Sequence, residues 1–298
     1  MKVISRITSG LGNQLFQYAC GLHVSSVLDA QLELDTSWFD YFQRHAVKRK
    51  YRLDRLNIPH LNEYARGTKR FAIGLATVNS SWIAPFAHPF LKSLKLELRS
   101  ESKRSVIDPS IALPPSNKFS ILLSGYWQTC DHFLKNSALL KEYFRPSFTM
   151  SQDAQEWLSR IHSTQSAFIH VRRGDYLNFS GGGLRMHYYE VAAKTLESLM
   201  GPVRWHVFSD DQGWCRENLG FLGNASYVSC SSPDNDIEEI QLMAACKGGI
   251  IANSSFSWWG GALGDSPHRH ILCPRNWWGS ADSDYRDLRL PSWIPIDN

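Results

Sequence analysis

Two adjacent arginines, Arg172 and Arg173, are the residues of this chain best placed to do chemistry. They follow 167–171, a mostly apolar run that predicts a short buried strand. Guanidinium groups are not buried in a strand without anionic partners, so we expect both at its carboxyl end, where open α/β sheets bind ligands. Because arginine binds phosphate through a planar fork, the pattern predicts a diphosphate-binding strand end. A solvated pair of surface arginines is the simpler alternative.

Polar side chains also follow two other predicted strands, 203–208 and 249–252. They are Asp210 and Asp211 after the first strand, and Asn253, Ser254 and Ser255 after the second. The carboxyl ends of parallel strands meet at one edge of a sheet, so we expect these side chains to converge with the arginines.

Each of these clusters allows more than one interpretation. Ser254 and Ser255 at a helix start can offer backbone N–H groups to an anion, or can simply cap the helix. Asp210 and Asp211 can bind a ribose hydroxyl, a guanine edge or a metal ion. Adjacent side chains in extended backbone point to opposite sides, so we expect one of the two aspartates to cap the helix that follows.

The elements that carry these clusters alternate regularly through the second half of the chain. Strands are predicted at 167–171, 203–208, 226–230, 249–252 and 270–273, and helices at 188–200, 212–219 and 236–246. Such alternation predicts a parallel sheet with right-handed crossovers. We expect the strand at 270–273 to close the series.

The first half begins with a strand, a tight turn and a helix. We predict strands at 2–8, 31–35 and 119–124 and helices at 13–28 and 131–143. Between 38 and 117 the pattern blurs, and we expect helices whose boundaries it does not define. The polar, interrupted segment 146–152 is the predicted interdomain hinge.

Composition, net charge and missing motifs exclude several functional classes. With 298 residues, 43% hydrophobic and 20% charged, the chain is an ordinary globular protein of one large or two medium domains. Its net charge of +4 suits an anionic small ligand or an acidic membrane surface but is too weak to argue for nucleic acid. Common protease, hydrolase and NTPase motifs are absent, and the dinucleotide pattern is incomplete.

Cysteine usage and the amino terminus predict the compartment. Six cysteines are scattered without a CxxC pair, which fits a reducing environment. The sequence shows neither a signal peptide nor a long apolar span. We therefore predict a cytoplasmic protein. The basic run 48–50 is interpreted as a solvated helix face, with peripheral contact at the inner face of the cytoplasmic membrane as the alternative.

Four segments, 10–19, 170–176, 208–211 and 253–260, occur in an order that closely resembles glycosyltransferase family 11, the α-1,2-fucosyltransferases. The resemblance runs from the first strand to Trp293, and the size is similar to that of the bacterial members, which build O-antigen or blood-group-like glycans. It implies an α/β fold of GT-B architecture, with two Rossmann-like domains facing a cleft. Residues 1–148 would present the acceptor, and residues 149–298 would bind GDP-fucose.

The resemblance also implies the reaction and its partners. L-Fucose would move from GDP-β-L-fucose, with inversion, to the 2-hydroxyl of a terminal β-galactoside on an oligosaccharide or a lipid-linked glycan. No metal or other cofactor is expected. A fucosyltransferase of another linkage and a catalytically silent nucleotide- or sugar-binding protein are the alternatives.

Carried over position by position, the resemblance assigns the donor contacts. Arg172 would grip the β-phosphate, and Arg173 would either assist it or brace the loop through Asp175. The other expected donor contacts are His170 and Asp210 at the guanosine, Asn253, Ser254, Ser255 and Phe256 around the phosphates, and Asn13 from across the cleft. Trp258 and Trp259 would either stack on sugar or pack their helix.

The general base is the least defined part of the predicted site. The acceptor hydroxyl must lose a proton, for which Asp175 is the first candidate and His187 the second. Catalysis without a dedicated base is a further alternative. The chain departs from the family pattern in the short, glycine-rich segment 177–187. This departure leaves acceptor contacts from that loop open and points to an unusual acceptor preference.

Overall fold

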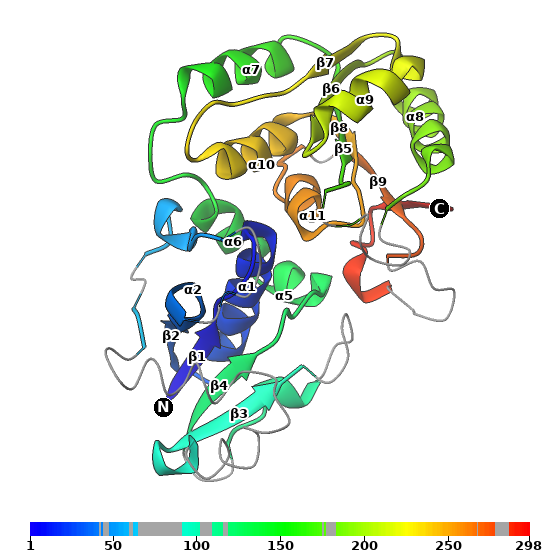
Figure 1. Cartoon of the computed structure of the whole chain (residues 1–298). Coiled ribbons are helices and arrows are strands. Elements are labelled where there is room, and N and C mark those ends of the chain that lie inside the picture. The colour runs from blue at the N-terminus through cyan, green and yellow to red at the C-terminus, as the bar shows by residue number, and fades with distance from the viewer. Residues whose placement is uncertain are drawn as a thin grey trace. The chain divides into compact units, whose positions relative to one another are not determined.

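The computed structural model describes residues 1–41, 43, 48–59, 62–64, 91–101, 109–115, 119–174, 176, 183–266, 268–277 and 286–298. The chain divides into two compact units, Met1–Ser147 and Phe148–Asn298 (Figure 1). Both units are built from parallel strands joined by helices. Within the described residues, no helix is long and apolar enough to cross a membrane.

The N-terminal unit contains a four-stranded parallel sheet in the order β2-β1-β4-β3. Its strands are β1 (Lys2–Arg6), β2 (Gln31–Asp35), β3 (Leu96–Ser100) and β4 (Ser120–Ser124). Its helices are α1 (Leu11–Val27), α2 (Ser37–Tyr41), α5 (Cys130–Lys135) and α6 (Ser137–Tyr143), with 3₁₀ turns at Leu53–Arg55 and Pro109–Ala112. The opening β1-α1-β2 is the predicted crossover, and β1 lies buried between β2 and β4.

Two predictions for this unit were wrong. The helix expected over 131–143 is interrupted at Asn136, whose backbone (φ −132°, ψ 23°) leaves the helical region between α5 and α6. The region 38–117, for which only helices were expected, supplies the edge strand β3. That strand alternates leucine with polar residues over only five positions, too few for its period to stand out.

Two buried glutamines fix the turn between β1 and α1. Gln17 accepts a hydrogen bond from the Thr8 backbone N–H (2.8 Å) and donates to the Gly125 carbonyl (3.0 Å). Gln14 donates to the Ser9 carbonyl (3.0 Å) and accepts from the Arg52 N–H (2.9 Å). Buried amides need such partners, so these residues of the 10–19 motif serve the architecture.

The C-terminal unit contains a six-stranded parallel sheet in the order β10-β9-β8-β5-β6-β7. Its strands are β5 (Ser166–Val171), β6 (Arg204–Ser209), β7 (Ala225–Tyr227), β8 (Gly248–Ile250), β9 (His270–Pro274) and β10 (Ile294–Ile296). Its helices are α7 (Gln152–His162), α8 (Met186–Met200), α9 (Gln212–Asn218), α10 (Asn235–Ala245) and α11 (Ser255–Ala262), with 3₁₀ turns at Gly220–Leu222 and Arg286–Leu288.

The predicted alternation in this half is confirmed, with two corrections. Helix α7 precedes β5 and was not predicted. The series does not close at β9, because β10 pairs with it in parallel as a further edge strand. A three-residue strand containing Pro295 carries little sequence signal, and proline is tolerated there because the strand lies at an edge.

The strand order creates a switch point between β5 and β8. From β5 the chain adds β6 and β7 on one side and then returns to place β8 on the other. At such a reversal the crossovers cover opposite faces of the sheet, which leaves a crevice at the carboxyl ends of the two strands. All residues of β5 are buried, and partly exposed polar side chains begin only beyond Val171.

Arg269 joins the ends of the two helices that flank β8. Its guanidinium donates to the carbonyls of Cys246 (2.7 Å) and Met243 (2.6 Å) at the end of α10. It also donates to those of Gly261 (2.6 Å) and Gly260 (3.3 Å) in α11. A cation at a helix carboxyl end satisfies carbonyls that lack partners and complements the helix dipole. One side chain therefore fixes α10 and α11 together.

Candidate active site

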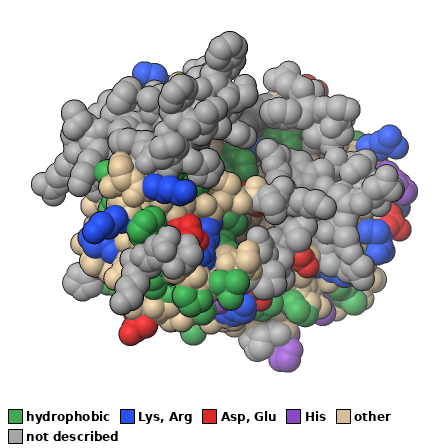
Figure 2. Space-filling model, turned by 90° about the horizontal axis from the view of Figure 1, so that it is seen from below, with side chains coloured by type: hydrophobic (Ala, Val, Ile, Leu, Met, Phe, Trp, Pro, Cys, Tyr) green, Lys and Arg blue, Asp and Glu red, His purple; other side chains and the backbone are tan. Residues whose placement is uncertain are grey.

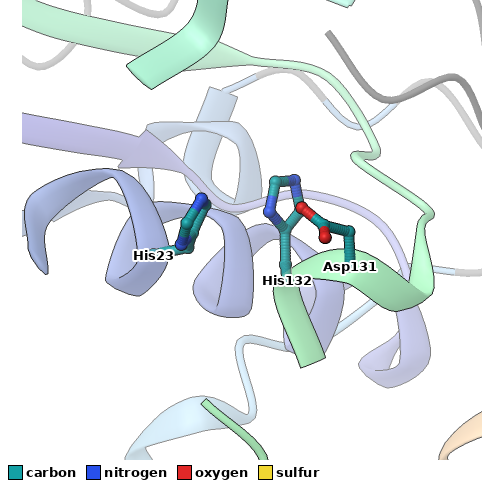
Figure 3. A group of neighbouring side chains, drawn as sticks. All are labelled: His23, Asp131 and His132. Carbon is teal, nitrogen blue, oxygen red and sulfur yellow. The ribbon is translucent and has the colours of Figure 1, made fainter. Parts of the chain in front are cut away.

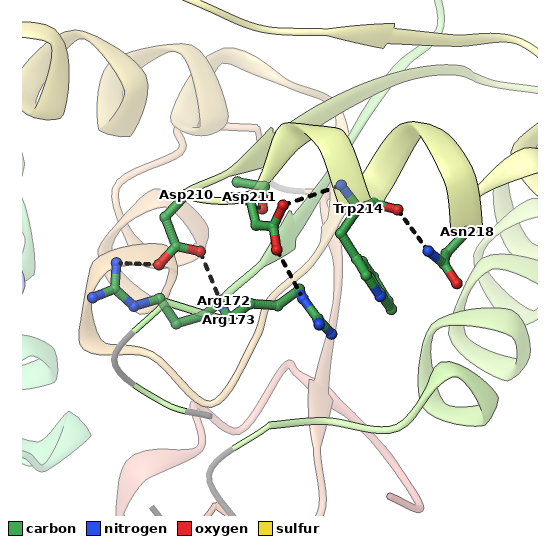
Figure 4. Close-up of polar contacts among 7 residues, drawn as sticks. Arg172, Arg173, Asp210, Asp211, Trp214 and Asn218 are labelled. Carbon is green, nitrogen blue, oxygen red and sulfur yellow. Dashed lines mark hydrogen bonds and ion pairs between the residues drawn. The ribbon is translucent and has the colours of Figure 1, made fainter. Parts of the chain in front are cut away.

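The predicted polar clusters of β5 and β6 meet at the carboxyl edge of the sheet (Figure 4). Val171 pairs with Ser209 in the strand register, which brings Arg172 beside Asp210. Arg172 Nη1 lies 3.1 Å from Asp210 Oδ2, and the Arg173 backbone N–H donates to Asp210 Oδ1 at 2.9 Å. One carboxylate therefore holds both the Arg172 guanidinium and the backbone after β5.

Arg173 is turned toward α9 and away from Arg172 (Figure 4). Its Nε donates to Asp211 Oδ2 (3.1 Å), and its guanidinium lies 4.0 Å from the centre of the Trp214 ring. Asp211 Oδ1 accepts from the Trp214 N–H (3.1 Å) and so caps α9. The expectation that one of the two aspartates caps this helix is confirmed. Asp175 lies outside the described residues, so its predicted contact with Arg173 stays a prediction. Asp211 makes a contact of this kind with Arg173.

Arg172 combines a fixed position with access to ligands. Its side chain is 22% exposed and that of Asp210 is 26% exposed, so the pair is neither sealed in the core nor fully solvated. The guanidinium also lies 5.5 Å from the centre of the Tyr176 ring. A guanidinium oriented in this way presents N–H donors to an anion without a large loss of side-chain entropy.

The Asp210 carboxylate lies close to the backbone at Gly174. A Cβ added at Gly174 would lie 2.5 Å from Asp210 Oδ2. Gly174→Ala is therefore expected to displace the carboxylate from Arg172 and lower kcat/KM by about tenfold, which corresponds to about 1.4 kcal/mol of transition-state stabilisation.

The matched control for this prediction is Gly213→Ala in α9. Its added Cβ would meet only Asp211 Oδ1 at 3.9 Å, and we expect near-normal rates because alanine favours a helix. Steady-state kinetics of the two variants provide the measurement. Equal rates in both would show that the Asp210 position does not matter for turnover.

His170, the last but one residue of β5, contacts the start of α11. It is 4% exposed, and its ring centre lies 5.6 Å from that of Phe256. Burial, and then the nearby Arg172 cation, lower the pKa of His170 to about 3, so the imidazole is neutral at neutral pH. Its Nδ1 has no hydrogen-bond partner among the described residues. A neutral imidazole can orient a ligand through hydrogen bonding but cannot balance phosphate charge.

The residues between β8 and α11 build the helix start. Ser254 Oγ accepts from the Phe256 N–H (3.3 Å), so Ser254 is the N-cap of α11. Asn253 Nδ2 donates to the Trp277 carbonyl (3.1 Å), and Ser255 begins the helix. The capping interpretation is confirmed for Ser254. It leaves the anion interpretation open, because the remaining N–H groups and the dipole of the first turn still favour negative charge.

Trp258 and Trp259 are packing residues. Both side chains are fully buried, with ring centres 4.8 Å apart, and Trp258 Nε1 donates to the Leu288 carbonyl (2.6 Å). Of the two interpretations of these tryptophans, the packing one fits the structure. Trp258 holds α11 against the residues that precede β10, Leu288 and Trp293.

The remaining predicted site residues are placed as follows. Asn13 lies in the first turn of α1, in the N-terminal unit, and its Oδ1 accepts from Gln128 Nε2 (2.7 Å). His187 is exposed in the first turn of α8. Asp175 and the segment 177–182 lie outside the described residues. The functions assigned to these residues stay predictions.

Trp214 and Arg269 support the site but were not predicted from the sequence. Trp214 is the third residue after the cap Asp211 and places an aromatic face under Arg173, a spacing that the sequence displays but does not interpret. Arg269 lies just before β9, and only the fold shows that its guanidinium reaches two helix ends.

Two Rossmann-like units and an arginine-bearing strand end at a topological switch point define a protein of the doubly wound α/β class, in which ligands bind at the carboxyl ends of the strands. Residues 79–297 match the model of glycosyl transferase family 11, and this chain belongs to that family. The family predicted from the four sequence segments is thereby confirmed.

Two curated relatives match nearly the whole chain. An alpha-1,2-colitosyltransferase of Escherichia coli is 30% identical over 302 residues, covering 99% of each chain. The O-antigen biosynthesis glycosyltransferase WbnK of Escherichia coli is 28% identical over 317 residues, covering 98% of this chain and 99% of that protein.

A solved structure confirms the fold. The crystal structure of the alpha-1,6-fucosyltransferase NodZ soaked with GDP-fucose, an enzyme from Bradyrhizobium, superposes with a TM-score of 0.52. The match covers 88% of this chain and 92% of that one at 13% identity. The two Rossmann-like domains therefore represent the predicted GT-B architecture.

Proposed function

We propose that this protein is an inverting galactoside 2-α-L-fucosyltransferase that uses GDP-β-L-fucose. The observation that carries the proposal is the Arg172–Asp210 pair at the carboxyl end of β5, in a chain of glycosyl transferase family 11. NodZ, which shares the fold, was soaked with GDP-fucose. The two Escherichia coli relatives add an α-1,2 linkage and an O-antigen product as support.

In the proposed reaction Arg172 binds the β-phosphate of the donor. The acceptor O2 attacks the anomeric carbon of fucose from the face opposite the nucleotide, and the bond from that carbon to the β-phosphate oxygen breaks. The bonding electrons remain on GDP, so negative charge grows next to Arg172 as the bond lengthens. A contact that strengthens toward the transition state raises kcat and not only affinity.

The other predicted donor contacts complete this arrangement. The first turn of α11 would receive the diphosphate, with Asn253, Ser254, Ser255 and Phe256 around it. His170 and Asp210 are proposed to orient the guanosine, and Asn13 to approach the donor from the N-terminal domain. The structure adds a function for Arg173, which supports the turn through Asp211 and Trp214.

The acceptor hydroxyl loses its proton as the new bond forms. We keep Asp175 as the first proposed base and His187 as the second. Because cationic and backbone donors are available for the diphosphate, we propose that no metal or other cofactor takes part in transfer.

A second donor is favoured by one relative, the alpha-1,2-colitosyltransferase. Colitose is L-fucose without its 3-hydroxyl, so the two sugars differ by one oxygen. A site that hydrogen-bonds this hydroxyl would reject the deoxy sugar by about 10⁴-fold or more, whereas an apolar one would discriminate weakly. Contacts to the diphosphate do not distinguish the two donors.

The experiment is GDP release in EDTA, followed by determination of the product linkage. GDP-fucose, GDP-colitose and GDP-mannose are compared as donors. Each donor is tested with lactose, with Galβ1,3GalNAc and without an acceptor. We expect acceptor-dependent release from GDP-fucose and fucose on galactose O2.

Each other result replaces the proposal with a named alternative. Faster transfer from GDP-colitose would make the protein a colitosyltransferase. Fucose on another hydroxyl would establish a different linkage. GDP-fucose binding without transfer to these acceptors would favour a binding protein or an acceptor outside the set. Loss of turnover in EDTA, restored by Mg²⁺ or Mn²⁺ but not by Zn²⁺, would contradict metal-independent transfer.

A further inference from the structure

Three potential metal ligands gather in the N-terminal unit, between α1 and α5 (Figure 3). His23 belongs to α1, whereas Asp131 and His132 belong to α5. One ligand atom from each residue lies within 4.8 Å of the others, and the two imidazole centres are 5.3 Å apart. Two imidazoles and one carboxylate are a donor set suited to Zn²⁺ and neighbouring transition metals.

The two histidines are held inside the unit. His132 is 4% exposed and His23 is 8% exposed. Among the described residues, His132 Nδ1 has no hydrogen-bond partner, which is unusual for a buried polar atom.

A lysine already places a cation in this cluster. Lys135 Nζ lies 2.7 Å from Asp131 Oδ2 and 3.4 Å from His23 Nε2. The simpler interpretation is that this ammonium group completes the cluster by itself. However, it leaves His132 Nδ1 unsatisfied, and the Lys135 side chain is 48% exposed and can turn into solvent. The ammonium group thus acts as a competitor that a more strongly bound cation can displace.

We propose that His23, Asp131 and His132 form a binding site for a divalent transition-metal ion of the Zn²⁺ type. Ligand atoms around a tetrahedral ion lie about 3.3 Å apart, so the side chains must approach one another by up to about 1.5 Å on binding. Three protein ligands leave one coordination position for water. The ion displaces Lys135 and links α1 to α5.

Such a metal ion would restrict the movement of the segment that carries Asn13. Asn13 lies in the first turn of α1, and Gln128, which donates to it, lies two residues before α5. The same two segments are therefore joined at one place by an amide hydrogen bond and at another by the metal. The site is structural, and none of its three ligands belongs to the predicted donor-binding set.

Calorimetric titration of the metal-free full-length protein with Zn²⁺, together with the absorption spectrum of the Co²⁺ form, tests the site. We expect saturable binding of one ion and the visible bands of a four-coordinate cobalt. Asp131→Asn and His23→Gln are each expected to weaken binding by about tenfold or more. Lys135→Met is expected to strengthen it by about tenfold, because the competing ammonium group is gone.

The control is His162→Gln, which removes an exposed histidine of α7 and is expected to leave binding unchanged. Absence of saturable binding to the wild type would overturn the proposal. Binding that is equally strong in the Asp131→Asn and His23→Gln proteins would also overturn it. Because the readout is metal occupancy and not transfer, the outcome is independent of the proposed fucosyltransferase activity.

Discussion

Arg172→Ala is expected to lower kcat by about a hundredfold or more while GDP still binds. The guanidinium is oriented by Asp210 at 3.1 Å, at the edge of the sheet where a diphosphate would be received. In the proposed reaction the β-phosphate gains charge as the fucose bond breaks, so losing this donor costs more in the transition state than in the ground state. Arg172→Lys keeps the positive charge but loses the planar, forked donor geometry of the guanidinium. We expect its kcat to lie between those of Arg172→Ala and the wild type.

Steady-state kinetics and GDP titration of the same preparations separate the two effects. Arg216→Ala is a control from the same domain: its guanidinium lies 4.2 Å from the Tyr227 ring centre and outside the proposed site, so normal turnover is expected. An unchanged kcat in Arg172→Ala would remove this residue from the mechanism. If GDP affinity and turnover fell by the same factor, Arg172 would contribute to binding of the donor but not specifically to the transition state.

The pairing that orients Arg172 could be predicted only in part. Polar residues after apolar runs are visible in the sequence, and the rule that parallel strands present their carboxyl ends at one edge brings them together. The contact itself depends on register, since Val171 faces Ser209 and a shift of one residue would separate Arg172 from Asp210. Register is decided by packing across the whole sheet, which the local sequence does not display.

The difference between local sequence signals and long-range packing also explains the errors in the predicted fold. The strands β5 and β6 have mostly apolar sequences over 167–171 and 203–208 and were predicted. By contrast, β10 has three residues including a proline and, among the described strands, pairs only with the edge of β9. The break at Asn136 between α5 and α6 carries neither glycine nor proline as a signal. Long-range packing overrides local preference in such segments.

Charge is the property that composition predicted most directly. On the face shown in Figure 2, lysines and arginines lie among acidic and apolar side chains, in keeping with a net charge of +4. A net charge of +4 is mild, so recognition of an anionic donor is expected to depend mainly on oriented groups such as Arg172 and the start of α11.

Arg269→Met is expected to reduce the free energy of unfolding by about 2–4 kcal/mol. The guanidinium donates to four carbonyls at the ends of α10 and α11, and methionine fills a similar volume without any donor. Burial lowers the pKa of Arg269 to about 10, so the side chain is still a cation at neutral pH and complements both helix dipoles. Lysine at this position would reach fewer carbonyls and is expected to restore only part of the stability.

Urea denaturation of the variant measures the change, with Arg275→Met as the control. Arg275 pairs with Asp297 at an exposed position, and we expect its loss to change stability by less than about 1 kcal/mol. Equal effects of the two substitutions would show that the carbonyls at Arg269 are readily hydrated. Because the start of α11 is proposed to receive the diphosphate, a displaced α11 should also raise the KM for GDP-fucose. An unstable Arg269→Met protein with an unchanged KM would mean that Ser254 and the buried tryptophans hold the helix start without help from its far end.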